Sequence, residues 1–254
     1  MIRAACLVLP LLLAACGPGP GPARPEASAG TTDTRPARLL VFTRTLGWHH
    51  DSIPAAVQTL RELARAEGME VVHSEDPARF SDGNLRRFRA VVFANTTLDI
   101  LDDAQQAALE RFVRAGGGFL GIHSAADTEY GWPWYGELVG AWFDSHPPGL
   151  QATVVRFEPG RGPPGVDTWP VTDEIYNYRR NPHPHVDVVA TVDERLYEGG
   201  TMGDDHPIAW CHARFGGRAW YTGLGHDRAL YADPVFRAHL RRGLRYVTGL
   251  SGDC

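Results

Sequence analysis

The fold of this chain is decided by residues 115–127, which read Ala-Gly-Gly-Gly-Phe-Leu-Gly-Ile-His-Ser-Ala-Ala-Asp. The glycines are expected to end a helix, the apolar residues to form a short strand, and His123 to follow at the carboxyl end of that strand. In open α/β sheets, ligands bind at this end of the strands. The stretch therefore predicts that His123 belongs to a binding or catalytic site.

Two more strands are expected to end close to histidines. An apolar stretch at 39–43 precedes Trp-His-His-Asp at 48–51, and a stretch at 218–221 precedes Gly-Leu-Gly-His-Asp at 223–227. Because ligands gather at the carboxyl ends of strands in such sheets, we expect these histidines to meet. The pattern predicts one convergent site and not scattered surface residues.

The first half of the chain alternates apolar strands with amphipathic helices. One helix should begin at Asp51 or Ser52 and stop at Gly68, and another should begin at a capping box of Asp102 and Gln105. The strands are expected at 39–42, 71–72, 90–93 and 119–122. This alternation predicts an α/β fold with a flavodoxin-like, doubly wound, mostly parallel sheet. One edge of that sheet would carry residues 48–50, 95–97 and 123–124.

The second half is less regular and is expected to add further strands. We predict strands at 151–157 and 186–192 and a β-hairpin formed by 206–215 and 217–221. A final helix should start at Asp233-Pro234.

Composition limits the functions that the chain can have. Its 254 residues suffice for one sizeable domain, and a formal net charge of -5 gives no electrostatic basis for binding nucleic acid. All 25 basic residues are arginines. The absence of lysine excludes Schiff-base catalysis and a P-loop.

The N-terminus is expected to be a lipoprotein signal. Residues 1–15 hold a short basic region and an apolar run, and Leu-Ala-Ala-Cys at 13–16 resembles the lipobox of bacterial lipoproteins. Residues 16–37 would then be a lipidated Cys16 and a disordered linker, and residues 38–250 the domain. We expect a lipid anchor in the bacterial cell envelope, and Gly17 resembles the outer-membrane sorting pattern. An ordinary signal peptide with an incidental cysteine is the alternative.

The domain itself contains two cysteines, Cys211 and Cys254. They could pair in an oxidising compartment, but a terminal residue is usually mobile, so two free thiols are expected. No Cys-x-x-Cys spacing indicates a thiolate metal site.

The polar residues near the predicted strand ends form the candidate site. The candidate reacting groups are His50, His123, Glu174 and His226. The candidate substrate contacts are Trp48, His49, Asn95, Asp127, His146, Tyr176, His206 and Asp227. Adjacent residues in extended backbone point opposite ways, so only one of His49 and His50 should face the site. The histidines at 73, 183, 185, 212 and 239 are expected to be structural or solvated.

Two chemistries fit these residue types. Histidine with carboxylate partners can transfer protons near neutral pH, and the same groups can bind a divalent metal, for which His50, His123 and His226 are candidates. The His-Glu-x-x-His motif is absent, so a metal site would need ligands from distant loops. Aromatic residues near the histidines would suit a carbohydrate, although a large core would use the same residues.

Six ordered motifs between residues 38 and 249 resemble the ThuA-like family, which is named for trehalose utilisation. The motifs are 47–52, 116–124, 138–141 with His146-Pro147, 173–176, 206–210 and 223–227. The resemblance implies the fold of class I glutamine amidotransferases, which agrees with the flavodoxin-like prediction. Those enzymes carry a cysteine nucleophile at a strand–helix elbow. Here the elbow reads Gly-Ile-His-Ser-Ala at 121–125, so glutamine hydrolysis is not expected, and Ser124 is one position off the apex.

The resemblance also implies sugar catabolism, in particular of trehalose-like disaccharides and their 3-keto derivatives. A keto group acidifies the neighbouring C–H bond, so a histidine or carboxylate base could drive elimination, hydration or isomerisation. On this hypothesis His123 is the main base or ligand, with His226 and His49 or His50 beside it and Glu174 and Tyr176 in contact with the sugar. A non-catalytic glycan-binding module and a metal-dependent hydrolase are the alternatives.

Overall fold

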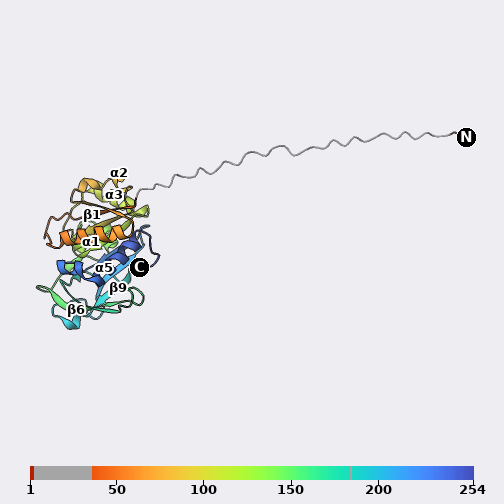
Figure 1. Cartoon of the computed structure of the whole chain (residues 1–254). Helices are drawn as coiled ribbons and strands as arrows, with labels where there is room; N and C mark the ends of the chain where they lie inside the picture. The colour runs from red at the N-terminus through yellow and green to blue at the C-terminus, as the bar shows by residue number, and fades with distance from the viewer. Residues whose placement is uncertain (3–35, 184) are drawn as a thin grey trace. The chain divides into compact units, whose positions relative to one another are not determined.

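The computed structural model describes residues 1–2, 36–183 and 185–254, and residues 36–254 form one compact unit (Figure 1). The lipobox-like sequence and Cys16 lie outside the described residues. Within the described part, no helix is both long enough and apolar enough to cross a bilayer.

A nine-stranded mixed sheet runs through the domain in the order β2-β1-β3-β4-β11-β10-β9-β6-β7. Its strands are β1 (Arg38–Phe42), β2 (Glu70–Ser74), β3 (Ala90–Ala94), β4 (Gly118–Ile122), β6 (Gln151–Phe157), β7 (Thr168–Asp173), β9 (Asp187–Val192), β10 (Pro207–His212) and β11 (Ala219–Thr222). The first five positions of the sheet are parallel, and the order 2-1-3-4 followed by β11 is the predicted flavodoxin-like order.

Helices cover both faces of the parallel half. One face packs against α1 (Ile53–Ala66) and α5 (Pro234–Val247), which lie side by side in Figure 1. The other face packs against α2 (Asp82–Leu85), α3 (Asp103–Arg114) and α4 (Pro133–Val139). Successive residues of β1 alternate between the two cores, as a strand buried on both faces requires.

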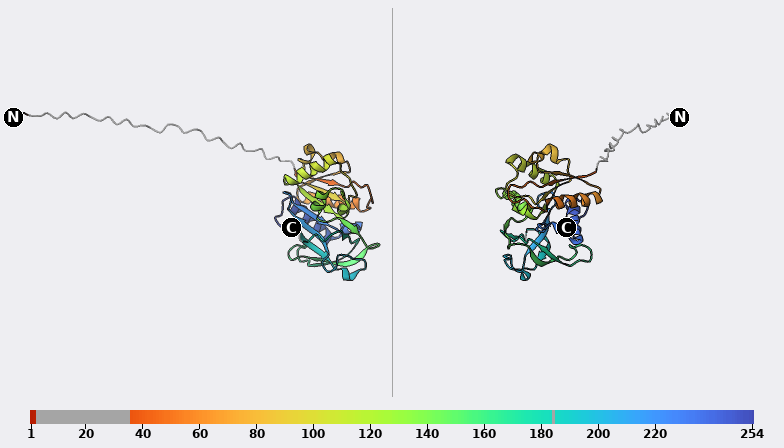
Figure 2. Two further views of the ribbon diagram at one scale, coloured as in Figure 1. Left: turned by 180° about the vertical axis from the view of Figure 1, so that it is seen from behind. Right: turned by 60° about the vertical axis from the view of Figure 1, so that its left-hand side comes forward.

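The antiparallel half extends the sheet from β11 through a hairpin with β10 to β9, β6 and β7. In the views of Figures 1 and 2, this half lies at the end of the domain opposite α2 and α3. The predicted strands and hairpin are present, but β7 was not predicted. Pro170 lies within this strand, and proline is tolerated there because β7 is at the sheet edge. A two-stranded sheet of β5 (Phe143–Ser145) and β8 (Asn177–Tyr178) was not predicted either.

The prediction of two free thiols is wrong, because Cys211 and Cys254 form a disulfide. Cys211 lies in β10, and the residues after α5 return to it. The guanidinium of Arg242 donates a hydrogen bond to the Cys254 carbonyl at 2.6 Å, so the terminal residue is held in place. The packing of α5 brings Cys254 next to Cys211. The spacing of two single cysteines in a sequence does not reveal such a contact.

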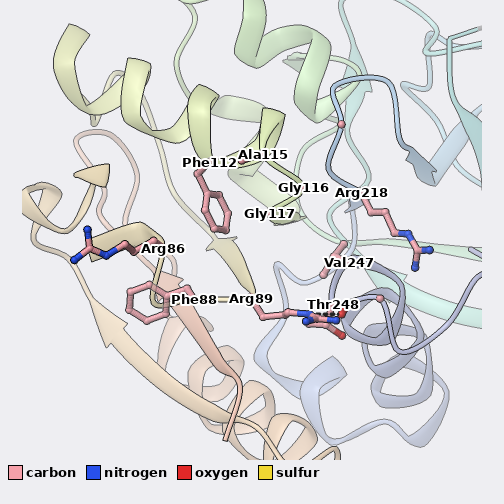
Figure 3. A pocket seen from close by; sticks show the side chains of 12 residues that line it. Arg86, Phe88, Arg89, Phe112, Ala115, Gly116, Gly117, Arg218, Val247 and Thr248 are labelled. Carbon is pink, nitrogen blue, oxygen red and sulfur yellow. Dashed lines mark hydrogen bonds between the residues drawn. The ribbon is translucent and has the colours of Figure 1, made fainter. Parts of the chain in front are cut away.

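The amino edge of the parallel strands carries a cavity of about 390 Å³ lined by Arg86, Arg89 and Arg218 (Figure 3). The Arg89 side chain reaches the residues that follow α5 and donates to the Thr248 carbonyl at 2.7 Å. Arg218 donates to the carbonyls of Tyr246 and Ser251. These guanidinium groups satisfy carbonyls at a helix C-terminus, where positive charge is favourable.

Candidate functional site

The predicted elbow is present after β4. The strand ends at Ile122, and a short 3-10 helix, η2, begins at His123 and ends at Asp127. His123 has φ = +49°, a left-handed conformation that is strained for a residue with a β-carbon. A β-carbon at Gly121 would lie 3.1 Å from the Ala125 β-carbon, so the tight turn leaves little room for a side chain there. The elbow places the His123 ring at the carboxyl edge of the sheet, fully buried.

The loop after β11 holds His226 through its backbone. The buried carboxylate of Asp173, at the end of β7, accepts hydrogen bonds from the N–H groups of Gly225 at 2.7 Å and Asp227 at 2.8 Å. Gly225 has φ = +121° and its carbonyl accepts from the Ser52 hydroxyl at 3.1 Å. The loop conformation is therefore fixed by elements that lie far apart in the sequence.

His50 and Glu174 complete the group. His50 lies just before α1 and is 3 % exposed, with its Nδ1 3.4 Å from the Ser124 hydroxyl. Glu174 follows β7 directly and is 7 % exposed. One ligand atom from each of His50, His123, Glu174 and His226 lies within 4.8 Å of all the others. We call these four residues the His/Glu cluster.

The closest contacts in the cluster join three atoms. His123 Nε2 lies 3.4 Å from Glu174 Oε2, His226 Nδ1 lies 3.2 Å from the same oxygen, and the two ring nitrogens lie 3.3 Å apart. His123 Nδ1 is 2.8 Å from the Gly223 carbonyl. Because a carbonyl only accepts, this nitrogen carries the proton and Nε2 of a neutral ring carries a lone pair. The arrangement can bind a cation, or transfer protons through the rings.

Burial and charge shift the pKa values in the cluster. Burial, together with the neighbouring imidazoles of His123 and His226, lowers the pKa of His50 to about 3. Burial alone would raise the pKa of Glu174, but the adjacent imidazoles of His123 and His226 hold it well below its usual range. The hydrogen bond with Glu174 raises the pKa of His226 above its ordinary value. The carboxylate is therefore ionised and His50 neutral at physiological pH.

A cavity of about 450 Å³ opens onto the cluster. Its lining residues are Trp48, His50, Asp127, Phe143, His146, Glu174, Tyr176 and His226. The aromatic rings form walls, and the Tyr176 ring lies with its centroid 4.2 Å from that of His123. Burial raises the pKa of Asp127, although the Tyr130 hydroxyl donates to its carboxylate at 2.6 Å. Aromatic walls with a few convergent polar groups are typical of a site for a small polar ligand.

Comparison with known proteins shows the family. The model of the family described as trehalose utilisation, ThuA, matches residues 38–247. The chain belongs to the ThuA family. No curated protein sequence matches the chain significantly.

Solved structures agree with the ThuA assignment at the level of the fold. A ThuA-like protein from Bacteroides uniformis is 19% identical, with a TM-score of 0.72 over 83% of this chain and 91% of that chain. A ThuA-like protein from Parabacteroides merdae is 18% identical, with a TM-score of 0.68 over 84% of this chain and 90% of that chain. A β-galactosidase from Bacillus circulans sp. alkalophilus is 12% identical and shares the fold over 30% of its own length, with a TM-score of 0.52.

The structure brings together all four predicted reacting groups of this ThuA-family chain, namely His50, His123, Glu174 and His226. Of the predicted substrate contacts, Trp48, Asp127, His146 and Tyr176 line the cavity. His123 does not line it, because its ring lies behind Tyr176 and the other cluster residues. This placement favours a ligand or positioning role for His123 over direct proton transfer to a substrate.

The other predicted substrate contacts lie outside the cavity. His49 is exposed, and the buried Asn95 amide donates to the Ser52 hydroxyl and to the Gly225 carbonyl. Asp227 accepts from the Ala229 N–H at the start of a 3-10 turn. His206 is fully buried, with Nδ1 2.7 Å from Glu194 Oε1 and Nε2 2.9 Å from the Tyr176 carbonyl. Asn95 and His206 thus support residues of the site from behind.

Sequence reasoning missed Phe143, whose ring centroid lies 4.3 Å from that of Tyr176 in the cavity wall. A single phenylalanine in the sequence does not indicate that its side chain will line a cavity. Of the histidines predicted to be structural, His212 donates from Nε2 to the Leu138 carbonyl at 2.8 Å, and His183 pairs with Asp205 at the surface. These placements agree with the prediction for both residues.

Proposed function

We propose that the chain is an enzyme that acts on a small keto-carbohydrate by proton transfer next to the carbonyl group. The observation that carries the proposal is the His/Glu cluster at the floor of the aromatic-walled cavity. Membership of a family described as trehalose utilisation supports a sugar as the substrate. A trehalose-like 3-keto disaccharide or 3-keto glucoside is the substrate class that we favour.

The cavity divides the chemistry between its floor and its wall. The floor carries the imidazoles of His50 and His226, whose N–H groups can donate to a carbonyl oxygen on which negative charge develops. Asp127 and His146 line the wall beside the cluster, with His146 Nδ1 3.3 Å from Glu174 Oε1, and can accept a proton. When the C–H bond beside the carbonyl breaks, the proton passes to the wall base and the electron pair moves onto the oxygen. Return of the proton to the opposite face of that carbon completes an isomerisation. In an elimination the electron pair instead returns from the oxygen, a double bond forms between that carbon and the next, and the substituent on the next carbon leaves with its bonding electrons.

Proton exchange with solvent tests this proposal directly. The purified chain is incubated with 3-keto-trehalose or a 3-keto glucoside in D₂O, and the NMR signal of the proton beside the carbonyl is followed. We expect the chain to accelerate loss of that signal, and Asp127→Asn and His146→Ala together to slow it by about 100-fold or more. His183→Ala is the matched control, because this histidine pairs with a surface carboxylate, Asp205, outside the cavity.

The alternative of a non-catalytic glycan-binding module predicts a different result. The sugar would bind to the chain and shift its melting temperature, but neither exchange nor product would appear. That outcome with both keto-sugars and with the corresponding unoxidised sugars would reject the enzyme proposal.

We also propose that the domain is held in the bacterial cell envelope by a lipid on Cys16. The lipobox-like sequence at 13–16 supports this proposal. Labelling of cells with a fatty-acid analogue should mark the wild-type chain and not Cys16→Ser. Equal labelling of both chains would contradict it.

A further inference from the structure

The distances between nitrogen and oxygen atoms of the His/Glu cluster match those between neighbouring ligand atoms around a metal ion. His123 Nε2, His226 Nδ1 and Glu174 Oε2 are separated from one another by 3.2 to 3.4 Å. Ligands of a tetrahedral Zn²⁺ at the usual bond lengths lie about 3.3 Å apart. The fourth residue, His50, also places one atom within 4.8 Å of the other three. Four donors from four separate segments thus surround one point.

With neutral rings, hydrogen bonds account for only part of these contacts. Since His123 Nδ1 donates to the Gly223 carbonyl, the neutral ring turns a lone pair toward a carboxylate oxygen and toward another ring nitrogen. A proton on His226 Nδ1 can be shared with Glu174 or with His123, but the lone pair of His123 Nε2 then still faces the Glu174 carboxylate at 3.4 Å. A cation at the centre would accept lone pairs from all three atoms at once.

We propose that His50, His123, Glu174 and His226 bind one divalent transition-metal ion of the zinc class. Three imidazoles with one carboxylate suit Zn²⁺, Mn²⁺, Fe²⁺ or Co²⁺, whereas Mg²⁺ and Ca²⁺ require oxygen ligands. The surroundings of the ligands agree with this assignment. A backbone carbonyl fixes the tautomer of His123, and the Asp173 carboxylate fixes the loop that carries His226, as partners behind metal ligands commonly do.

The metal would be open to a substrate on one side. His50, Glu174 and His226 line the cavity, and His123 closes the opposite side. An oxygen atom of a ligand in the cavity could therefore complete the coordination shell, and the metal would polarise it as a Lewis acid. This catalytic role rests on the proposed function, whereas binding of the metal does not.

The test measures the metal alone on the full chain. The protein is purified without a polyhistidine tag and without chelators, its metal content is measured by mass spectrometry, and Zn²⁺ and Co²⁺ are titrated into chelator-treated protein. We expect about one metal ion per chain and a melting temperature that rises with Zn²⁺. His226→Ala and Glu174→Gln should each lower the affinity for Zn²⁺ by about 100-fold or more. His183→Ala should bind Zn²⁺ as the wild type does, because His183 pairs with Asp205 away from the cluster.

Two results would overturn the metal site. One is a folded wild-type chain that holds far less than one metal ion and shows no shift with Zn²⁺, Mn²⁺ or Co²⁺. The other is Zn²⁺ affinity that is unchanged in both His226→Ala and Glu174→Gln. If either variant fails to fold, the visible absorption of Co²⁺ on the wild type decides, because a spectrum that stays that of the free aqueous ion would contradict binding by the cluster. Metal binding without sugar turnover contradicts the proposed function and leaves the metal site standing. Turnover by metal-free protein overturns the catalytic role of the metal and leaves the proposed function standing.

Discussion

The two edges of the parallel sheet use their polar side chains in opposite ways. At the amino edge, Arg89 and Arg218 donate to carbonyls at the end of α5 (Figure 3). At the carboxyl edge, Glu174, His123 and His226 turn toward one another beside a cavity. The first edge satisfies backbone carbonyls of the fold, whereas the second concentrates side chains whose close polar contacts are largely with one another. A cavity lined by charged residues is therefore not by itself evidence of a functional site. The distinction is whether those side chains are hydrogen-bonded to backbone carbonyls or turn toward one another.

The largest effect is expected from Glu174→Gln at the carboxyl edge. Loss of the carboxylate removes the negative partner of His123 and His226, so turnover of a keto-sugar should fall by about 10³-fold. The melting temperature of the metal-free protein should change little, because the contacts of this carboxylate are with histidine rings and not with the backbone. Steady-state kinetics and thermal unfolding check both parts. Asp205→Asn, at a surface histidine–carboxylate pair, is the control and should leave turnover unchanged.

A smaller loss of turnover is expected from Asp173→Asn, which tests whether the loop after β11 positions His226. The carboxylate accepts from three backbone N–H groups, of Gly225, His226 and Asp227. The amide cannot accept from all of them, so turnover should fall by about 10- to 100-fold and Zn²⁺ affinity should fall with it. A lower melting temperature with unchanged Zn²⁺ affinity would show that Asp173 serves the fold alone.

Substitution of an arginine at the amino edge should lower the stability of the protein and leave its activity unchanged. Arg89→Ala removes the hydrogen bond to the Thr248 carbonyl, and the free energy of unfolding should fall by about 1 kcal/mol, because the guanidinium is largely exposed. Denaturant unfolding measures this change, and turnover should remain that of the wild type. A loss of turnover as large as that of Glu174→Gln would break the contrast between the two edges.

The smallest effect at neutral pH is expected from His239→Leu in α5, a region apart from both edges. His239 is buried with neither ring nitrogen hydrogen-bonded, and burial, with a contribution from Arg242, lowers its pKa to about 3. The folded state thus holds this ring neutral, while the unfolded chain takes up a proton below about pH 6.5. The wild type should lose stability as the pH falls from about 6.5 toward 3, and His239→Leu should lose less. Parallel losses in both proteins would refute this account.

Local patterns in the sequence predicted the parallel half of the fold well. Apolar runs, helix caps and the glycine-rich elbow act over a few residues, so β1, β3, β4 and the helices α1 and α3 followed from them, whereas α4 was not predicted. The capping box of Asp102 and Gln105 is present. The edge strand β7 was missed because Pro170 and its alternating burial give no continuous apolar run. The disulfide was missed because it depends on the return of the chain after α5.

The sequence by itself determined that histidines follow β4 and β11, since strand and turn signals are local. Only the tertiary structure decided that His50 and not His49 joins them, and that Glu174 lies between the rings. It also placed Asp173 beside a loop that lies more than 50 residues later in the sequence. The physical reason is that a reacting centre depends on the directions of a few side chains, and these directions are set by packing between distant segments. Periodicity places a residue on an element, but only the packed neighbours determine what that residue faces.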